Sequence, residues 1–163
     1  MNYLFLGSLL NFLHLSATVV WFGALTTNAF VLMPSAREAL EPPVVGKLMG
    51  AVMKRFRVLV YINIVVLIVT GIFMSMRSGY YSGFMKFTNL WSTISSVKHI
   101  LIIILVDLVI YAFEGLAKKV SRFAARGPSP ELARLQKKQI MFSYIGMVMA
   151  IIILILTGIL TAI

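Results

Sequence analysis

Residues 139–162 read QIMFSYIGMVMAIIILILTGILTA and contain no charged side chain. Because each residue adds ~1.5 Å to an α-helix, a stretch of this length crosses a hydrocarbon core of about 30 Å. Three similar apolar blocks precede it, so we expect membrane helices at residues 4–33, 56–76, 91–114 and 139–162. The first block has no Lys or Arg before it and runs to Met33, so we expect it to remain as a membrane helix rather than act as a cleaved signal sequence.

The composition agrees with a membrane protein. Of the 163 residues 60% are hydrophobic, and the mean hydropathy is +0.96, far outside the range of soluble domains. We therefore predict an all-α fold, with residues 1–163 forming one transmembrane four-helix bundle of up-down-up-down order. The chain has no cysteine, which excludes disulfides, thiolate metal sites, iron–sulfur clusters and covalently attached haem.

The basic residues are concentrated in two connections. Twelve of the 15 lie in Pro34–Arg57 and Gly115–Gln139, whereas the middle connection holds only Arg77 and Lys86. The positive-inside rule then places both termini and the middle loop outside the cytoplasmic membrane of a prokaryote. This distribution accounts for the net charge of +10 without a nucleic-acid partner.

The two halves of the chain share a pattern. Thr70-Gly71 ends the second predicted helix, and Thr157-Gly158 lies in the fourth. His14 precedes Thr70 by 56 residues, and His99 precedes Thr157 by 58. The chain is thus either two related helical hairpins, repeated in parallel, or a chance recurrence of a common dipeptide.

The two histidines, His14 and His99, are the main candidates for chemistry. Both lie roughly 12–15 Å below the outer ends of predicted helices 1 and 3. These helices are normally diagonal in such a bundle, which leaves room for a flat macrocycle between them. Two facing imidazoles are the ligands of a six-coordinate haem b iron, so both histidines are candidate metal ligands. The alternative is that each imidazole only forms a hydrogen bond to a neighbouring helix.

Other unusual residues accompany the histidines. Trp21 follows His14 by two helical turns and either contacts the same ring or packs the interior. Lys98 is costly inside a membrane helix. It therefore snorkels to the interface, pairs with a haem propionate, transfers protons or binds the metal as a neutral amine. Asp107 needs another partner, such as Asn63, Arg55 or Arg57, or a second subunit; alternatively it stays protonated.

Methionine offers an alternative metal site. Met74, Met76 and Met85, with a histidine, could bind copper(I), because soft thioethers favour this ion. No phosphate-binding glycine loop, His-Glu-x-x-His helix or Ser-His-Asp pattern is present, so hydrolase and nucleotide chemistry have no support.

The segment His14-Leu-Ser-Ala-Thr-Val-Val-Trp21-Phe-Gly23 resembles the first-helix signature of the copper-resistance D (CopD) membrane domain and of the HemJ-type protoporphyrinogen oxidases. Arg55-Phe56, Thr70-Gly71 and Lys98 are similar to the same pattern. In HemJ-type proteins the corresponding His and Lys are associated with haem, so the resemblance implies such roles for His14 and Lys98.

The resemblance has two departures. His99 is not part of the pattern, which leaves the second axial ligand open between His99 and Lys98. Residues Ala24–Val31 stand where the HemJ-type proteins have a Pro-Arg element, which weakens the oxidase assignment.

We therefore expect a b-type cytochrome that transfers electrons within or across the membrane. Its expected partners are lipid, a quinone or soluble redox partner, and a second copy in a homodimer. A HemJ-like oxidase, a CopD-like copper transport protein and a purely structural subunit are the alternatives, so whether the protein is an enzyme stays open.

Overall fold

The computed structural model describes residues 2–81 and 83–163, and within these ranges all regular structure is helical. Four helical stretches there are long and apolar enough to cross a membrane, namely Leu4–Ala39, Val44–Arg77, Leu90–Ala124 and Pro130–Ala162. The predicted all-α class with four membrane helices is confirmed.

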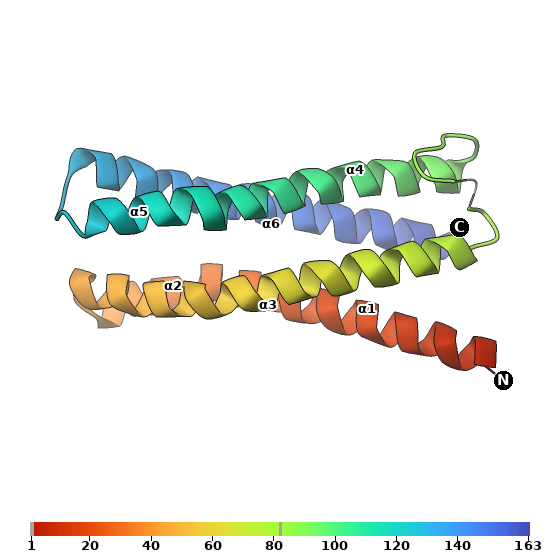
Figure 1. Ribbon diagram of the computed structural model, residues 1–163, viewed down its shortest axis with the longest axis horizontal. Helices are drawn as coiled ribbons and strands as arrows, with labels where there is room; N and C mark the ends of the chain where they lie inside the picture. Colours follow the sequence, from red (N-terminus) through yellow and green to blue (C-terminus); the bar gives the residue numbers. More distant parts are fainter. Residues whose placement is uncertain (1, 82) are drawn as a thin grey trace. The chain divides into compact units, whose positions relative to one another are not determined.

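The chain divides into two compact units, Met1–Phe84 and Met85–Ile163, and each unit is a helical hairpin (Figure 1). Unit 1 consists of α1 (Asn2–Thr27), the π-helix η1 (Asn28–Leu32), α2 (Met33–Ala39) and α3 (Pro42–Arg77). Unit 2 consists of α4 (Leu90–Ile110), the π-helix η2 (Tyr111–Leu116), α5 (Ala117–Ala124) and α6 (Pro130–Ala162). The main contacts are α1 with α3 in unit 1 and α4 with α6 in unit 2.

The predicted helix boundaries were too short at the basic ends. Only Leu40–Glu41 separates α2 from α3, and only Ala125–Ser129 separates α5 from α6. Hydropathy marks the edge of the hydrocarbon, whereas a helix continues into water as long as its backbone bonds are made. Pro42 and Pro130 begin α3 and α6, where a missing N–H costs nothing.

Each unit carries a π-helical segment in its first long stretch. In η1, the backbone N–H of Met33 donates to Asn28 O, a spacing of five residues. Pro34 follows directly and cannot donate a backbone hydrogen bond, so the widened turn accommodates a residue that a regular helix interior excludes. Segments of this kind frequently mark functional positions.

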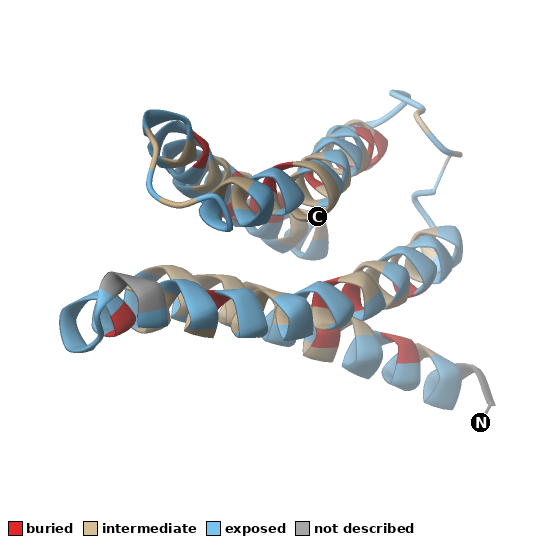
Figure 2. Cartoon of the chain, turned by 60° about the vertical axis from the view of Figure 1, so that its left-hand side comes forward, coloured by how far each residue is buried: buried red, intermediate tan, exposed pale blue. Residues whose placement is uncertain are grey.

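Most apolar side chains lie on the outside, as the many exposed positions in Figure 2 show. Buried side chains are few and include Leu10, Ala17, Val60 and Thr70 in unit 1, and Leu105, Met147, Ala150 and Ile153 in unit 2. In water, such an exposed apolar surface would drive aggregation. It suits a chain whose helices face lipid.

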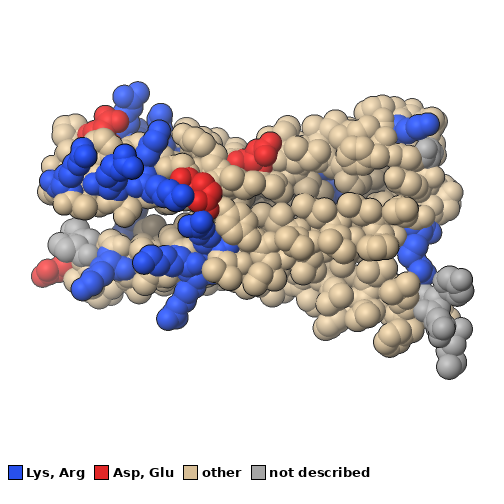
Figure 3. Space-filling view, in the orientation of Figure 1, with Lys and Arg blue, Asp and Glu red and all other residues tan. Residues whose placement is uncertain are grey.

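Basic residues gather near the turn of each hairpin (Figure 3). Unit 1 has Arg37, Lys47, Lys54, Arg55 and Arg57 on α2 and the first half of α3. Unit 2 has its cluster on α5, the α5–α6 turn and the first two turns of α6. Within each hairpin, the turn is therefore the strongly basic end.

Candidate functional site

His14 is held by a hydrogen bond that crosses the α1–α3 interface. Its Nδ1 atom lies 2.7 Å from Thr70 Oγ1, and the Thr70 hydroxyl itself donates to Val66 O at 2.6 Å. A hydroxyl has only one hydrogen, so His14 Nδ1–H is the donor and Thr70 Oγ1 the acceptor. In the neutral imidazole, Nε2 then carries the lone pair that a metal ion requires.

Gly71 lies beside this ring. A Cβ atom built on Gly71 would stand 3.5 Å from His14 Cε1, an ordinary van der Waals contact. The Thr-Gly pair thus has two functions at one position. Thr70 accepts the hydrogen bond, and Gly71 provides the surface on which the ring packs.

The register of the unit 1 hairpin follows from two contacts. His14 pairs with Thr70, and Gly7 lies beside Arg77, whose Nη2 atom would be 3.5 Å from a Cβ on Gly7. The two pairs are seven residues apart along each helix. Seven residues is the repeat of helices that pack at a shallow angle. Continued by seven, the same register brings Trp21 to the level of Asn63.

The side chains at the Trp21 level are partly polar. Asn63 is buried, and its Nδ2 atom donates to Leu59 O at 2.8 Å. Trp21 is half-buried, and in the described part of the chain no side chain or carbonyl accepts from its indole N–H. Trp21 therefore offers an aromatic face and a hydrogen-bond donor two turns below His14.

His99 is held by a bond to its own helix. Its Nδ1 atom lies 2.6 Å from Ser95 O and 3.5 Å from Ser95 Oγ. Because a carbonyl only accepts, His99 Nδ1 carries the hydrogen and Nε2 the lone pair. Both histidines are therefore held as the same tautomer, although the acceptor is a hydroxyl in unit 1 and a carbonyl in unit 2.

The second hairpin does not repeat the bond between histidine and threonine. Thr157 Oγ1 donates to Ile153 O at 2.8 Å, and the Nδ1 atom of His99 is bonded to Ser95. The shared pattern thus extends to the hairpin architecture and the π-helical segments, but not to this contact. His14 lies in unit 1 and His99 in unit 2, so the facing of their rings across one ligand stays a prediction.

Lys98 is half-buried within a membrane span. Across residues 2–81 and 83–163, no side chain or carbonyl forms a hydrogen bond or ion pair with its ammonium group. A cation in this position is stabilised by an anion. Lys98 lies next to His99 in the sequence.

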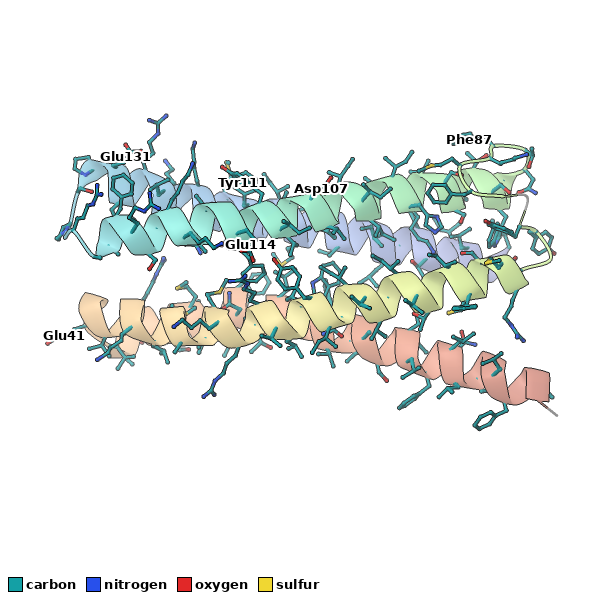
Figure 4. The ribbon with its side chains drawn as sticks, viewed as in Figure 1. Glu41, Phe87, Asp107, Tyr111, Glu114 and Glu131 are labelled. Carbon is teal, nitrogen blue, oxygen red and sulfur yellow. The ribbon has the colours of Figure 1, made fainter. Side chains whose placement is uncertain are left out.

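Three polar residues, Asp107, Tyr111 and Glu114, follow one another along α4 and η2 (Figure 4). Glu114 is ion-paired with Lys118 at 2.8 Å, and the ring of Tyr111 packs against Phe142 with centroids 5.4 Å apart. Asp107 is exposed, and its carboxylate has no hydrogen bond or ion pair with any described residue. The partner expected for Asp107 is thus not found within the described chain.

Sequence reasoning missed two features that the tertiary structure reveals. Asn28 Oδ1, at the start of η1, is buried without a hydrogen-bond partner in the described structure. The position of Arg77 beside Gly7 was also not foreseen. The sequence did contain a signal for the second feature. Gly7 precedes His14 by seven residues and Arg77 follows Thr70 by seven, so an antiparallel pairing of His14 with Thr70 also pairs Gly7 with Arg77.

The candidate copper ligands do not converge on one helix face. Met74 and Met76 are two residues apart on α3, so their side chains leave the helix about 200° apart. Met76 is 62% exposed. No cluster of three or more His, Asp or Glu occurs among the described residues, a finding that does not bear on a site built from two histidines.

Residues 8–160 match the family model described as predicted integral membrane protein (DUF2269). The chain belongs to this family. The match spans both hairpins and all four membrane helices. It supports a multi-pass membrane protein, whereas the closer resemblance to CopD and HemJ-type proteins stays a prediction. Comparison with curated proteins and with solved structures gives no match.

Proposed function

We propose that this member of the DUF2269 family is a membrane haem b protein, in which His14 and His99 supply axial ligands through Nε2. The observation that carries the proposal is the hydrogen bond from Nδ1–H of each imidazole to an acceptor of the protein. Metal-binding histidines are characteristically held in this way, because the second bond fixes the tautomer and directs the lone pair. The donor set thus fits a six-coordinate haem iron.

Lys98 and Trp21 complete the proposed site. Lys98, half-buried and without an anionic partner in the described chain, is suited to neutralise a propionate. We prefer this role to metal ligation, because His99 already has its lone pair fixed on Nε2. Trp21 contributes an apolar face beside the macrocycle.

The haem would supply one-electron chemistry, and the helices would supply a water-poor site with fixed ligands. The protein would exchange electrons with a quinone or a soluble redox partner. Basic turns at the cytoplasmic side of a prokaryotic membrane would leave both termini outside. An exposed Asp107 in an apolar span favours a partner outside the chain, so we include a homodimer in the proposal.

The resemblance to CopD and HemJ-type proteins supports haem through the positions of His14 and Lys98. Oxidation of protoporphyrinogen is the alternative within the same chemistry, and turnover that is lost in Lys98→Gln would favour it. The side chains of Met74 and Met76 leave α3 in nearly opposite directions, which gives copper transport less support. Retained copper(I) that is lost when both become Leu would instead favour transport.

The optical spectrum of the purified protein tests the proposal. After haem-replete expression, we expect a Soret band and, on reduction, sharp α and β bands that His14→Ala and His99→Ala each change or abolish. Asn11→Ala, at an exposed position on α1, is the matched control and should keep the wild-type spectrum. A colourless wild-type protein, or spectra that neither histidine variant changes, would refute the proposal.

A further inference from the structure

Arg77 lies on the same interface as His14, two turns farther from the basic turn. On α1, Gly7 precedes His14 by seven residues, and on α3, Arg77 follows Thr70 by seven. One contact joins His14 to Thr70, and the other brings Arg77 Nη2 against Gly7. The guanidinium level is therefore about 10 Å from the imidazole level along the hairpin.

The path of the Arg77 side chain distinguishes it from a simple interfacial anchor. An arginine that only snorkels extends from its helix end toward water. Arg77 instead reaches the neighbouring helix, where its Nη2 atom would lie 3.5 Å from a Cβ on Gly7. Arg77 as a whole residue is exposed.

We propose that Arg77 binds a carboxylate of the molecule whose metal His14 ligates, an inference that rests on the proposed haem function. A guanidinium presents parallel N–H donors that match the two oxygens of a carboxylate. Haem has an iron atom at its centre and two propionates along one edge. In unit 1, His14 would bind the iron and Arg77 would bind a propionate.

Each hairpin thereby contributes one imidazole and one cation. Unit 1 has His14 with Arg77, and unit 2 has His99 with Lys98. A carboxylate is costly to bury without a partner. Arg77 therefore favours a ligand with carboxylates over an uncharged porphyrin of the same size.

The test compares haem b with its dimethyl ester, in which both carboxylates are neutral. Apoprotein in detergent is titrated with each compound, and the dissociation constants are read from the Soret absorbance. We expect the wild-type protein to bind haem b at least tenfold more tightly than the ester. Arg77→Gln should reduce this preference by about tenfold or more, and Arg77→Lys should restore part of it.

Arg55→Gln is the matched control, because it removes the same charge from the same helix about six turns from Arg77, and it should keep the wild-type preference. Equal wild-type affinity for haem b and its ester would overturn the inference without requiring any variant to fold. An unchanged preference in Arg77→Gln would also overturn it. Both results leave haem binding intact, whereas a wild-type protein that binds neither compound refutes the proposed function itself.

Discussion

At the residue scale, the acceptor that each imidazole contacts determines which ring nitrogen carries the hydrogen. Ser95 O can only accept, so the hydrogen of His99 lies on Nδ1 whatever the surroundings. Thr70 can donate or accept, and only its short bond to Val66 O makes it an acceptor for His14. The Thr70 hydroxyl therefore helps to orient His14, and a valine of similar shape can replace it.

We expect Thr70→Val to weaken haem binding by roughly 10- to 100-fold while the iron stays ligated, because the bond that orients the ligand is lost. Titration followed by the Soret band measures the affinity, and unchanged band positions show that ligation is retained. Thr157→Val is the matched control in unit 2, since Thr157 bonds only to Ile153 O. Equal losses in both variants would argue against a specific role for Thr70.

At the element scale, close packing of α4 on α6 depends on a glycine. Gly146 is buried, and a Cβ placed on it would lie 3.8 Å from both Leu105 Cδ1 and Leu108 Cδ2. Small residues at such points let membrane helices approach one another, since lipid supplies no hydrophobic drive between them. The space accepts one methyl group but not a long side chain.

We therefore expect Gly146→Leu to destabilise the protein by about 1–3 kcal/mol, the usual cost of overpacking, and Gly146→Ala to be nearly neutral. Unfolding of the detergent-solubilised protein, followed by circular dichroism, measures the difference. Gly158→Leu is the matched control on α6, because no atom lies within 4 Å of a Cβ there. If the two leucine variants were equally stable, the α4–α6 contact would not depend on Gly146.

At the scale of the whole molecule, the distribution of charge determines the predicted orientation. The turns of both hairpins carry most of the basic residues, and positive charge is retained on the cytoplasmic side during insertion. The absence of cysteine makes this orientation directly measurable, because a single introduced thiol has no background.

We expect Gly79→Cys, in the loop after α3, to react with a membrane-impermeant maleimide in intact cells. Ala125→Cys, in the turn between α5 and α6, should react only after permeabilisation. Both positions are exposed, so accessibility within the protein does not limit the reaction. The reverse pattern would place both termini in the cytoplasm and contradict the positive-inside assignment.

The sequence by itself determined the four membrane helices and the basic ends of the hairpins, because the cost of burying charge in lipid is large and depends on composition alone. It also identified His14 and His99 as unusual. It did not locate the helix ends, because hydropathy records where the hydrocarbon stops rather than where backbone hydrogen bonding stops.

Only the tertiary structure decided which groups hold those histidines. The Thr70 hydroxyl reaches His14 because the antiparallel register of α1 and α3 brings residues 56 apart into contact, and that register depends on side-chain packing along the whole interface. Thr157 has nearly the same spacing from His99 but bonds within its own helix. Nearly equal spacing in sequence therefore gave a hydrogen bond between His14 and Thr70 but none between His99 and Thr157. A hydrogen bond forms only where the packing brings the two groups within about 3 Å.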